Sequence, residues 1–261
     1  MNRLLNFVAA IGAVTLGTVE FIGELALFTI SGVLHIFRPP YYPRQIARAF
    51  MEIGYFSLPV VALTALFTGM VLALQFYTGF SRFNASSTVA SVVVLAITRE
   101  LGPVLAGLMV SGRAGAAMAA ELGTMRVTDQ IDALSTLSTE PMKYLVAPRL
   151  LAATIALPLL VVLADILGVL GGYLVAIEKL GFTPGAYLTS TFSNLRAEDV
   201  ISGLTKAAVF GFVIALMGCF NGYRSRGGAQ GVGSATTTAV VSASILILAL
   251  DYILTQVLFV K

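Results

Sequence analysis

The sequence is short of charge. Only 11% of its 261 residues are Asp, Glu, Lys or Arg, whereas 57% are hydrophobic. Soluble domains carry about 25% charged residues, so this chain lacks the polar surface that a water-exposed domain needs. The composition therefore argues against an ordinary soluble protein and predicts an all-α integral membrane protein.

Histidine, cysteine and clustered positive charge are also scarce. The chain has one histidine, His35, and one cysteine, Cys219. A single histidine without cysteine or acidic neighbours is a poor metal ligand, and one cysteine cannot form an internal disulfide. The net charge of +3 comes from scattered Lys and Arg residues, which do not form a nucleic-acid-binding patch. We therefore expect no metal site and no nucleic-acid partner.

Five segments are long and apolar enough to cross a bilayer, which takes about 20 helical residues. They are Tyr55–Thr78, Ser86–Val110, Pro148–Ile177, Val200–Phe220 and Thr236–Val260. If the residues before Tyr55 are cytoplasmic, the cytoplasmic side holds Arg3, Arg38, Arg44, Arg48, Arg113, Arg126, Lys143, Arg149, Arg224 and Arg226. The other side then holds only Arg82, Lys179, Arg196 and Lys261. Because positive charge favours the cytoplasm, we expect the chain to begin inside and end outside.

Residues 1–53 are expected to form interfacial amphipathic helices, followed by one five-span domain over residues 54–261. The polar residues of the first 38 positions form one narrow stripe at helical spacing: Asn2, Asn6, Glu20, Glu24, Ser31, His35 and Arg38. Such a helix lies in the membrane interface with its polar stripe toward water. A sixth span is the alternative, which Glu20 and Glu24 disfavour because they lie near its centre. They also interrupt the apolar core that a cleavable signal peptide needs.

The most polar stretch lies between the second and third predicted spans and reads GRAGAAMAAELGTMRVTDQIDALSTLSTEPMKYLVAPR. It is too long for a simple turn, because helix connections usually take about 2–8 residues. Ala116–Met125 and Thr128–Leu137 contain good helix formers, and Thr139-Glu140-Pro141 is typical of the start of another helix. An apolar face made by Met125, Ile131 and Leu134 is suited to docking a cytoplasmic partner. A solvated loop that packs on its own membrane domain fits the pattern equally well.

Several motifs of the chain resemble one family. The run ELGTMRVTDQIDAL, followed by EPMKYLVAPR, closely resembles the cytoplasmic signature of the MlaE permease family, the membrane subunits of bacterial ABC transporters that move phospholipids. RELGPVLAGLMVSGRAG, FNGY and ALDYILT match the same family, so the resemblance covers about Arg44 to Leu258. Some relatives carry extra arginines before the last span. This chain reads VGSATTTAVV there, with Ser234 and Thr238, so a headgroup role for basic residues at these positions does not carry over.

The resemblance implies a homodimer of five-span subunits with interfacial N-terminal helices in the bacterial inner membrane. It implies that a coupling segment over Glu121–Pro141 meets an ATP-binding subunit, and its candidate residues are Glu121, Met125, Asp129, Ile131, Asp132 and Leu134. ATP and Mg would be held by that subunit, so this chain itself is not expected to be an enzyme. A periplasmic ring of MCE-domain protein and a small STAS-domain protein are further implied partners. The implied activity moves glycerophospholipids between the inner membrane and the MCE carrier, which keeps the outer membrane asymmetric.

Other chemistry has weak support in the sequence. Gly227–Ser234 reads GGAQGVGS, which has the glycine spacing of a phosphate-binding loop, but Ser234 stands where that motif needs lysine and no strand precedes it. We predict a flexible cytoplasmic turn there. An intramembrane aspartyl protease would need Asp165 and Asp251, and neither has the required sequence context. A proton-coupled secondary transporter that uses Glu100, Asp165 or Asp251 as a relay is the stronger alternative.

Apart from Arg149 at the cytoplasmic end of the third span, five charged residues fall within the predicted spans: Arg99, Glu100, Asp165, Lys206 and Asp251. A charge at the centre of a spanning helix costs about 2.5–3.5 kcal/mol on insertion scales, so these side chains are not expected to face lipid. They are predicted to line a substrate cavity, and the alternative is that they only tie neighbouring spans together.

The spacing of these residues predicts their partners. Lys206 and Asp251 lie at comparable depth below the outer ends of their spans and are expected to pair. Asp165 is closer in depth to Glu100, for which we find no basic partner at the same height. Pro103 lacks an N–H group, so it frees the carbonyl of Arg99 and is expected to bend the second span.

Overall fold

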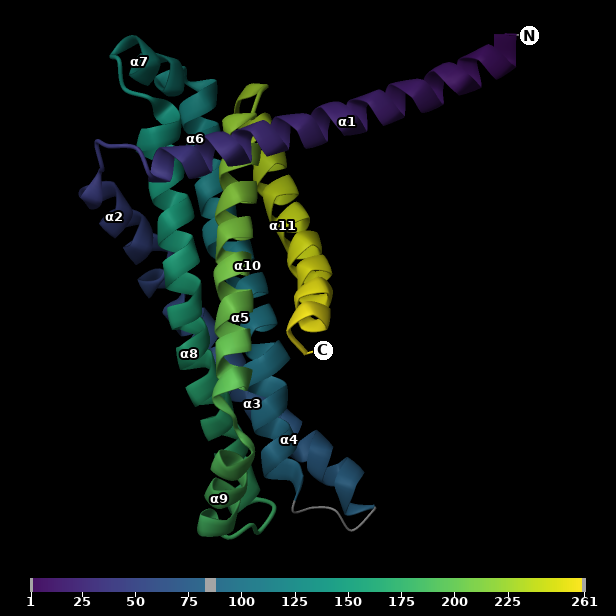
Figure 1. Cartoon of the computed structure of the whole chain (residues 1–261), viewed down its shortest axis with the longest axis vertical. Coiled ribbons are helices and arrows are strands. Elements are labelled where there is room, and N and C mark those ends of the chain that lie inside the picture. Colours follow the sequence, from purple (N-terminus) through teal and green to yellow (C-terminus); the bar gives the residue numbers. More distant parts are fainter. Residues whose placement is uncertain (1, 83–87, 260–261) are drawn as a thin grey trace.

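The computed structural model describes residues 2–82 and 88–259, and every regular element in those two ranges is helical. The long helices form one bundle (Figure 1). They are α3 (Leu58–Ser81), the continuous line from α4 to α6, α8 (Ala147–Glu178), α10 (Ala197–Tyr223) and α11 (Gly228–Phe259). The predicted all-α membrane architecture is confirmed. Two predicted span boundaries, Ser86 and Val260, and the C-terminal Lys261 lie outside the described residues.

Shorter elements mark the two ends of the bundle. At one end lie α2 (Pro43–Ile53) and α7 (Gln130–Thr136), and at the other lies α9 (Pro184–Asn194) (Figure 1). We call these the α7 end and the α9 end. The segment between the second and third predicted spans is helical, as expected, with α6 over Ala116–Val127. A π-helical turn, η5 (Met142–Val146), leads into α8.

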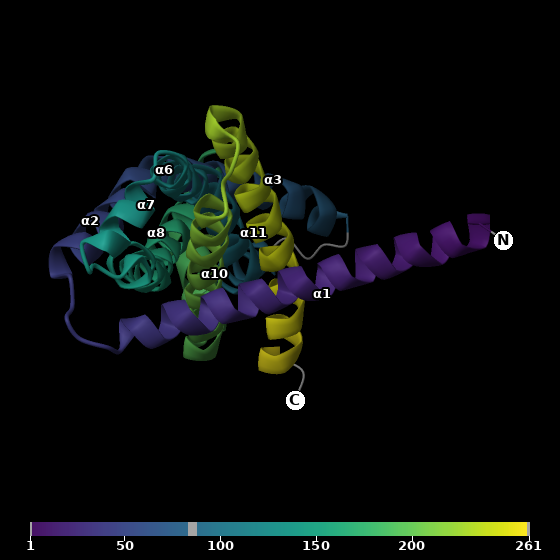
Figure 2. The ribbon, with the colours of Figure 1, turned by 90° about the horizontal axis from the view of Figure 1, so that it is seen from above.

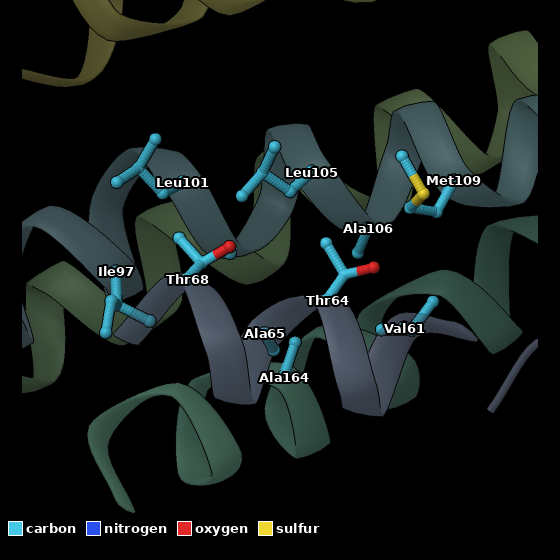
Figure 3. Close-up of a pocket in the computed structure, with 11 residues that line it drawn as sticks. Val61, Thr64, Ala65, Thr68, Ile97, Leu101, Leu105, Ala106, Met109 and Ala164 are labelled. Atoms are coloured by element: carbon cyan, nitrogen blue, oxygen red, sulfur yellow. The ribbon is translucent and has the colours of Figure 1, made fainter. Parts of the chain in front are cut away.

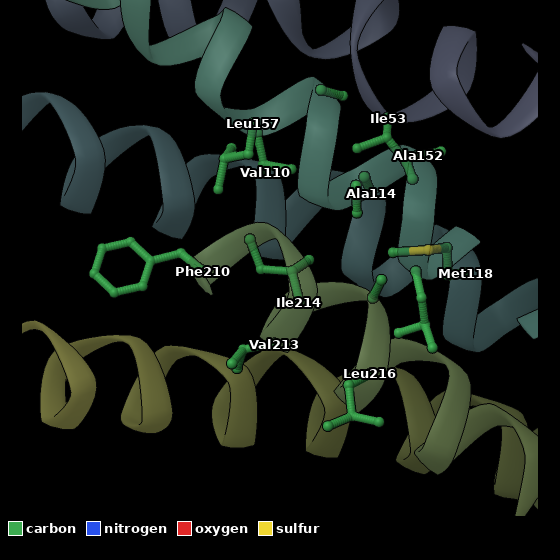
Figure 4. Close-up of a cluster of buried hydrophobic side chains, with 14 of the residues drawn as sticks. Ile53, Val110, Ala114, Met118, Ala152, Leu157, Phe210, Val213, Ile214 and Leu216 are labelled. Atoms are coloured by element: carbon green, nitrogen blue, oxygen red, sulfur yellow. The ribbon is translucent and has the colours of Figure 1, made fainter. Parts of the chain in front are cut away.

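The hydrophobic core lies where α8 and α10 pack against the line from α5 to α6. Leu157 of α8 and Phe210 and Ile214 of α10 meet Val110 and Met118 in this core (Figure 4). α10 is buried along most of its length, whereas α11 lies at the edge of the bundle and leaves much of its apolar surface uncovered. That surface is available to lipid or to another chain.

Helix α3 packs closely on α8 through glycines. A Cβ atom at Gly69 would lie 1.8 Å from the carbonyl oxygen of Gly168, and one at Gly171 would lie 2.2 Å from the carbonyl oxygen of Leu66. Small residues are common at helix contacts in membranes because packing, rather than the hydrophobic effect, holds the helices together. Glycine at these positions is therefore required by the distance between the two backbones.

We expect Gly69→Ala to destabilise the bundle, because the added methyl group forces α3 away from α8. Overpacking of this kind costs about 1–3 kcal/mol. The matched control is Gly79→Ala on the same helix, where a Cβ atom would meet nothing within 4 Å. The measurement is the yield and thermal midpoint of the purified protein in detergent. Equal midpoints for the two variants would show that the close α3–α8 contact is not needed.

The glycine-rich segment Gly227–Ser234 is not a flexible turn, and that prediction is wrong. The turn is confined to the residues before α11, and α11 begins at Gly228. Gly227 and Gly228 have φ values of +86° and +68°, which glycine adopts without strain. A Cβ atom at Gly231 would lie 1.7 Å from the carbonyl oxygen of Arg226, so glycine there lets the new helix start directly against the turn.

Helix α1 (Asn2–Ile36) does not run along the bundle but crosses its α7 end in both views (Figures 1 and 2). Phe28 packs edge-on against Phe220, with ring centroids 5.4 Å apart. Glu24 pairs with Arg224 at 2.8 Å, and His35 pairs with Glu140 at 2.7 Å. The stripe therefore contacts the protein at these two positions, which differs from the expectation, although Glu24 remains 44% exposed and only His35 is largely covered.

The apolar side of α1 remains exposed at Leu16, Leu27 and Ile30. By length and composition α1 is one of six helices in the described ranges that could cross a membrane. Its crosswise course favours the interfacial position, which stays a prediction.

An interfacial α1 places the N-terminus on the cytoplasmic side, whereas a sixth span places it outside. A cysteine introduced at Asn2 is therefore expected to resist an impermeant external reagent in intact cells and to react after permeabilisation. Cys219 is buried, so background labelling should be low. Labelling in intact cells by the external reagent would show that α1 spans the membrane.

Candidate functional site

Lys206 of α10 is the centre of a buried ion cluster. Its side chain is 0% exposed, and its Nζ atom lies 2.6 Å from Glu100 Oε2 and 2.9 Å from Asp251 Oδ1. Nζ also donates to Thr255 Oγ1 at 2.7 Å. We call Glu100, Lys206, Asp251 and Thr255 the Lys206 cluster. It joins the second predicted span, α10 and α11 inside the bundle.

The backbone of the second span is irregular beside this cluster. Between α4 (Val89–Ala96) and α5 (Gly102–Val110) lies a π-helical turn, η3, over Ile97–Leu101. Single π turns inside α-helices are frequent at functional sites. Pro103 follows, and the carbonyl oxygen of Arg99 accepts a hydrogen bond from Lys206 Nζ at 3.2 Å. The Arg99 carbonyl that Pro103 was predicted to free is therefore available, and it serves Lys206 as an extra acceptor. The π turn was not predicted, and the bend of the span stays a prediction.

A close contact between α10 and the π turn brings Lys206 within reach. A Cβ atom at Gly203 would lie 2.2 Å from the carbonyl oxygen of Thr98, so only glycine allows this approach. The contact lies about one turn from Lys206 along α10. In the sequence, the only indication of this close contact is Gly203, three residues before Lys206.

The predicted pair of Lys206 and Asp251 is confirmed, as an ion pair by distance rather than an aligned hydrogen bond. The prediction that Glu100 lacks a basic partner is wrong, because Lys206 is also its partner. Counting residues along straight helices compares the depths of Cα atoms only. A lysine stem is long and flexible, so its ammonium group can reach a carboxylate at another depth.

The charges of the Lys206 cluster do not cancel, because one ammonium faces two carboxylates. The Glu100 and Asp251 side chains are 38% and 21% exposed, respectively, whereas Lys206 is fully buried. Lys206 therefore does not itself line a cavity wall. It holds the two carboxylates in place, and these are the groups that reach the surface beside α11.

Arg99 points to a different partner from Glu100. Its Nε atom lies 3.5 Å from Asp199 Oδ1, in the first turn of α10. Asp199 Oδ2 also accepts a hydrogen bond from the backbone N–H of Arg196 at 3.0 Å, which caps the helix. The sequence analysis did not identify Asp199. An acidic residue three positions into a helix is a known capping signal and could have indicated it.

Asp165 does not belong to the Lys206 cluster. It lines an apolar cavity of about 540 Å³ between α4, α8, α9 and the start of α10, together with Val94, Ile166 and Phe192. Its Oδ1 atom is buried and has no hydrogen-bond partner in the part of the chain that the structure describes. A Cβ atom at Gly102 would lie 2.2 Å from that oxygen, so Asp165 rests against the end of the π turn.

A small apolar crevice lies on another side of the π turn, between α3 and α5. Thr64 and Thr68 of α3 face Leu101 and Leu105 across it (Figure 3). None of these residues was identified from the sequence, because threonines and leucines in an apolar helix give no signal of a site. Leu101 directly follows Glu100, so the crevice and the Lys206 cluster flank the same turn.

The predicted coupling segment is ordered largely by contacts within the chain. Glu121 of α6 pairs with Arg149 at 2.7 Å, and Asp132 of α7 pairs with Arg126 at 2.7 Å. Asp129 lies between α6 and α7 with φ +56°, a left-handed conformation that Asp tolerates better than most residues. These acidic residues therefore fix the shape of the segment.

The apolar face predicted for docking is not available as a whole. Ile131 is 0% exposed, and Met125 and Leu134 pack against the same core, so this face covers the protein's own bundle. The exposed large apolar side chain here is Leu137, at 74%, which directly follows α7. A hydrophobic period identifies an apolar face but not what covers it, so the sequence could not decide this point.

Long apolar helices around a buried ion cluster, with an ordered helical segment at one end, define a multi-pass membrane protein of the transporter type.

A family model described as Permease MlaE matches residues 46–257. The chain is 58% identical to a probable ABC transporter permease protein of Rickettsia felis, over 98% of this chain and 99% of that protein. It is 34% identical to the intermembrane phospholipid transport system permease protein MlaE of Haemophilus influenzae, over 98% of both chains. A probable ABC transporter permease protein of Synechocystis is 38% identical, over 90% of both. The chain belongs to the MlaE permease family and is an ABC transporter permease.

Proposed function

We propose that the chain moves glycerophospholipids between the bacterial inner membrane and a periplasmic MCE-domain carrier, which maintains the lipid asymmetry of the outer membrane. A separate ATP-binding subunit, which holds ATP and Mg, supplies the energy at the α7 end. A STAS-domain protein attached to that subunit completes the assembly. The family supports this proposal, as does the name of the Haemophilus relative, an intermembrane phospholipid transport system permease protein.

The observation that carries the proposal is the position of the two carboxylates beside α11. The uncovered face of α11 is apolar and includes Ile245, Leu248 and Tyr252, and Asp251 borders it. A second copy of the chain packed along this face would bury the apolar surface and enclose Glu100 and Asp251. The cavity between two copies would then have apolar walls for acyl chains and charged groups for polar headgroups.

A proton relay through the buried carboxylates has less support. Glu100 and Asp251 are both held by Lys206, whereas Asp165 lines a different cavity. The three groups therefore do not form one chain of proton acceptors in the described residues. No contact among residues 2–82 and 88–259 favours a secondary transporter over an ATP-driven permease.

The test is to purify the chain with its operon partners and reconstitute the complex in vesicles. We expect an ATPase subunit to co-purify, phospholipid to remain bound, and lipid transfer to require ATP. A variant of the ATPase subunit that binds but does not hydrolyse ATP is the control, and it should stop transfer. Transfer driven by a proton gradient without ATP would contradict the proposal.

A further inference from the structure

A charged cleft lies at the α7 end, away from the Lys206 cluster. Two adjoining cavities of about 160 and 260 Å³ separate α2 from α6 and share Glu52, Glu121 and Arg149 in their walls. Arg48 lines the first cavity and Arg113 the second. We call this space the α2–α6 cleft. Its floor is apolar, with Ile53 and Met118 among the lining residues.

The cleft carries an excess of one positive charge, because three guanidinium groups face two carboxylates. Arg149 is largely buried and pairs with Glu121 at 2.7 Å. Arg113 donates through one nitrogen to the carbonyl oxygen of Glu52 at 2.8 Å and to Ser57 Oγ at 2.9 Å. A guanidinium has five N–H donors in a planar fork that matches phosphate oxygens. Arg48, which is exposed, pairs through Nε with Glu52 at 2.9 Å. The three arginines are therefore held by the protein, and each keeps N–H donors that these contacts do not use.

The surroundings of the cleft place it at the level of lipid headgroups. Tyr55 and Phe56 are exposed at the start of the first span, where aromatic residues mark the membrane interface. Met51 is exposed on α2 just before them. The guanidinium of Arg113 lies over the ring of Phe56, 5.7 Å from its centroid. A ligand in the cleft would therefore have cationic groups on one side and an apolar, lipid-facing surface on the other.

We propose that the α2–α6 cleft binds the phosphodiester of a phospholipid from the leaflet at the α7 end. One phosphodiester would neutralise the excess charge, with its oxygens toward Arg48 and Arg113. Glu52 and Glu121 would be close enough to accept an ammonium group on the same headgroup, and the acyl chains would lie along Phe56. A free phosphate offers similar chemistry without the acyl chains. The inference goes beyond the proposed function, because headgroup binding needs neither ATP nor transport.

The chain contains no tryptophan, so one introduced tryptophan can report on this cleft alone. Phe56→Trp, reconstituted as the full chain in bilayers of a phosphate-free glycolipid, provides the fluorophore. A small fraction of phosphatidylethanolamine, brominated near the carboxyl ends of its acyl chains, acts as the quencher. The reference quencher is the same glycolipid brominated at the same positions. We expect the phospholipid to quench more strongly at equal fractions, because it is enriched at the cleft.

Two substitutions in the Phe56→Trp background test the arginines. Arg48→Gln together with Arg113→Gln is expected to weaken phospholipid binding about tenfold, as expected for the loss of charge-assisted hydrogen bonds. Arg48→Gln alone should weaken it less, and this exposed side chain can be changed without disturbing the fold. The matched control is Arg44→Gln, an exposed arginine one turn earlier on α2 that does not line either cavity. Its quenching should equal that of the parent.

Three results would overturn the proposal. The first is equal quenching by the two brominated lipids. The second is equal quenching in the Arg48→Gln and Arg44→Gln variants. The third is release of the phospholipid by millimolar inorganic phosphate, which would show that the cleft takes a soluble phosphate instead. Persistence of the selective quenching in added phosphate, at constant ionic strength, would support a lipid ligand.

Discussion

Lys206→Ala is expected to destabilise the folded permease severely and to abolish lipid transfer. The substitution removes the one ammonium group that lies between Glu100 and Asp251, so two carboxylates remain together in a poorly solvated site. Breaking a buried ion pair costs about 3–5 kcal/mol. The measurements are the yield of folded complex, its thermal midpoint and its rate of lipid transfer. Lys179→Ala, which removes an exposed lysine near the α9 end, is the control and should change none of them.

Exchanging the charges of Lys206 and Asp251 tests whether Lys206 pairs with Asp251 alone or also with Glu100. From the sequence alone, Lys206→Asp combined with Asp251→Lys should partly restore function, because the two were expected to pair only with each other. In the structure Glu100 also contacts Lys206, so the exchange would place a new carboxylate at position 206 beside Glu100. We therefore expect little rescue from the exchange alone and partial rescue when Glu100→Gln is added. Full rescue by the exchange alone would show that Glu100 is not coupled to Lys206.

Glu100→Gln on its own distinguishes a cavity role from a structural one. Lys206 keeps Asp251 and Thr255 as partners in this variant, so the complex should still fold. If the Glu100 carboxylate contacts the moving lipid, transfer should fall while the thermal midpoint changes little. Normal lipid transfer in this variant would show that the Lys206 cluster has only a structural role, holding neighbouring spans together.

Leu137→Asp is expected to release the ATPase subunit while the permease itself remains folded. Leu137 is the exposed apolar side chain of the coupling segment, so a charge there would disrupt contact with a partner. Ser138→Asp is the matched control, because it adds the same charge one residue away on an exposed polar position. The measurement is the amount of ATPase subunit that co-purifies with each variant. Equal recovery in both would show that docking does not involve Leu137.

Ile131→Asp is expected to behave differently from Leu137→Asp. Ile131 is fully buried in the permease core, so the substitution would bury an unpaired carboxylate. We expect a loss of about 3 kcal/mol or more in the stability of the permease, on the scale of severe core substitutions. The thermal midpoint of the isolated permease should therefore fall for Ile131→Asp and stay unchanged for Leu137→Asp. A stable permease with Ile131→Asp would mean that α7 does not depend on its contact with the core.

The sequence determined the class of fold because the bilayer permits few alternatives. A spanning backbone must satisfy its hydrogen bonds internally, so long apolar segments have to be helices. The positions of the spans followed from this rule. The helices between the second and third spans were predicted from their helix-forming residues. The pairing of Lys206 with Asp251 could also be predicted, because opposite charges at one depth in a low-dielectric medium have few other partners.

The tertiary structure decided which face of each helix meets which neighbour. The π turn at Ile97–Leu101 changes the rotation of the second span, so regular helical spacing cannot predict where Glu100 and Arg99 point. Glycine contacts at Gly203 and Gly69 set distances between helices that no local pattern contains. For the same reason the sequence could not show that Ile131 is covered by the chain itself, or that Asp165 lies apart from Glu100. Local periodicity fixes the helices, whereas rotation, distance and side-chain reach depend on contacts between segments far apart in the chain.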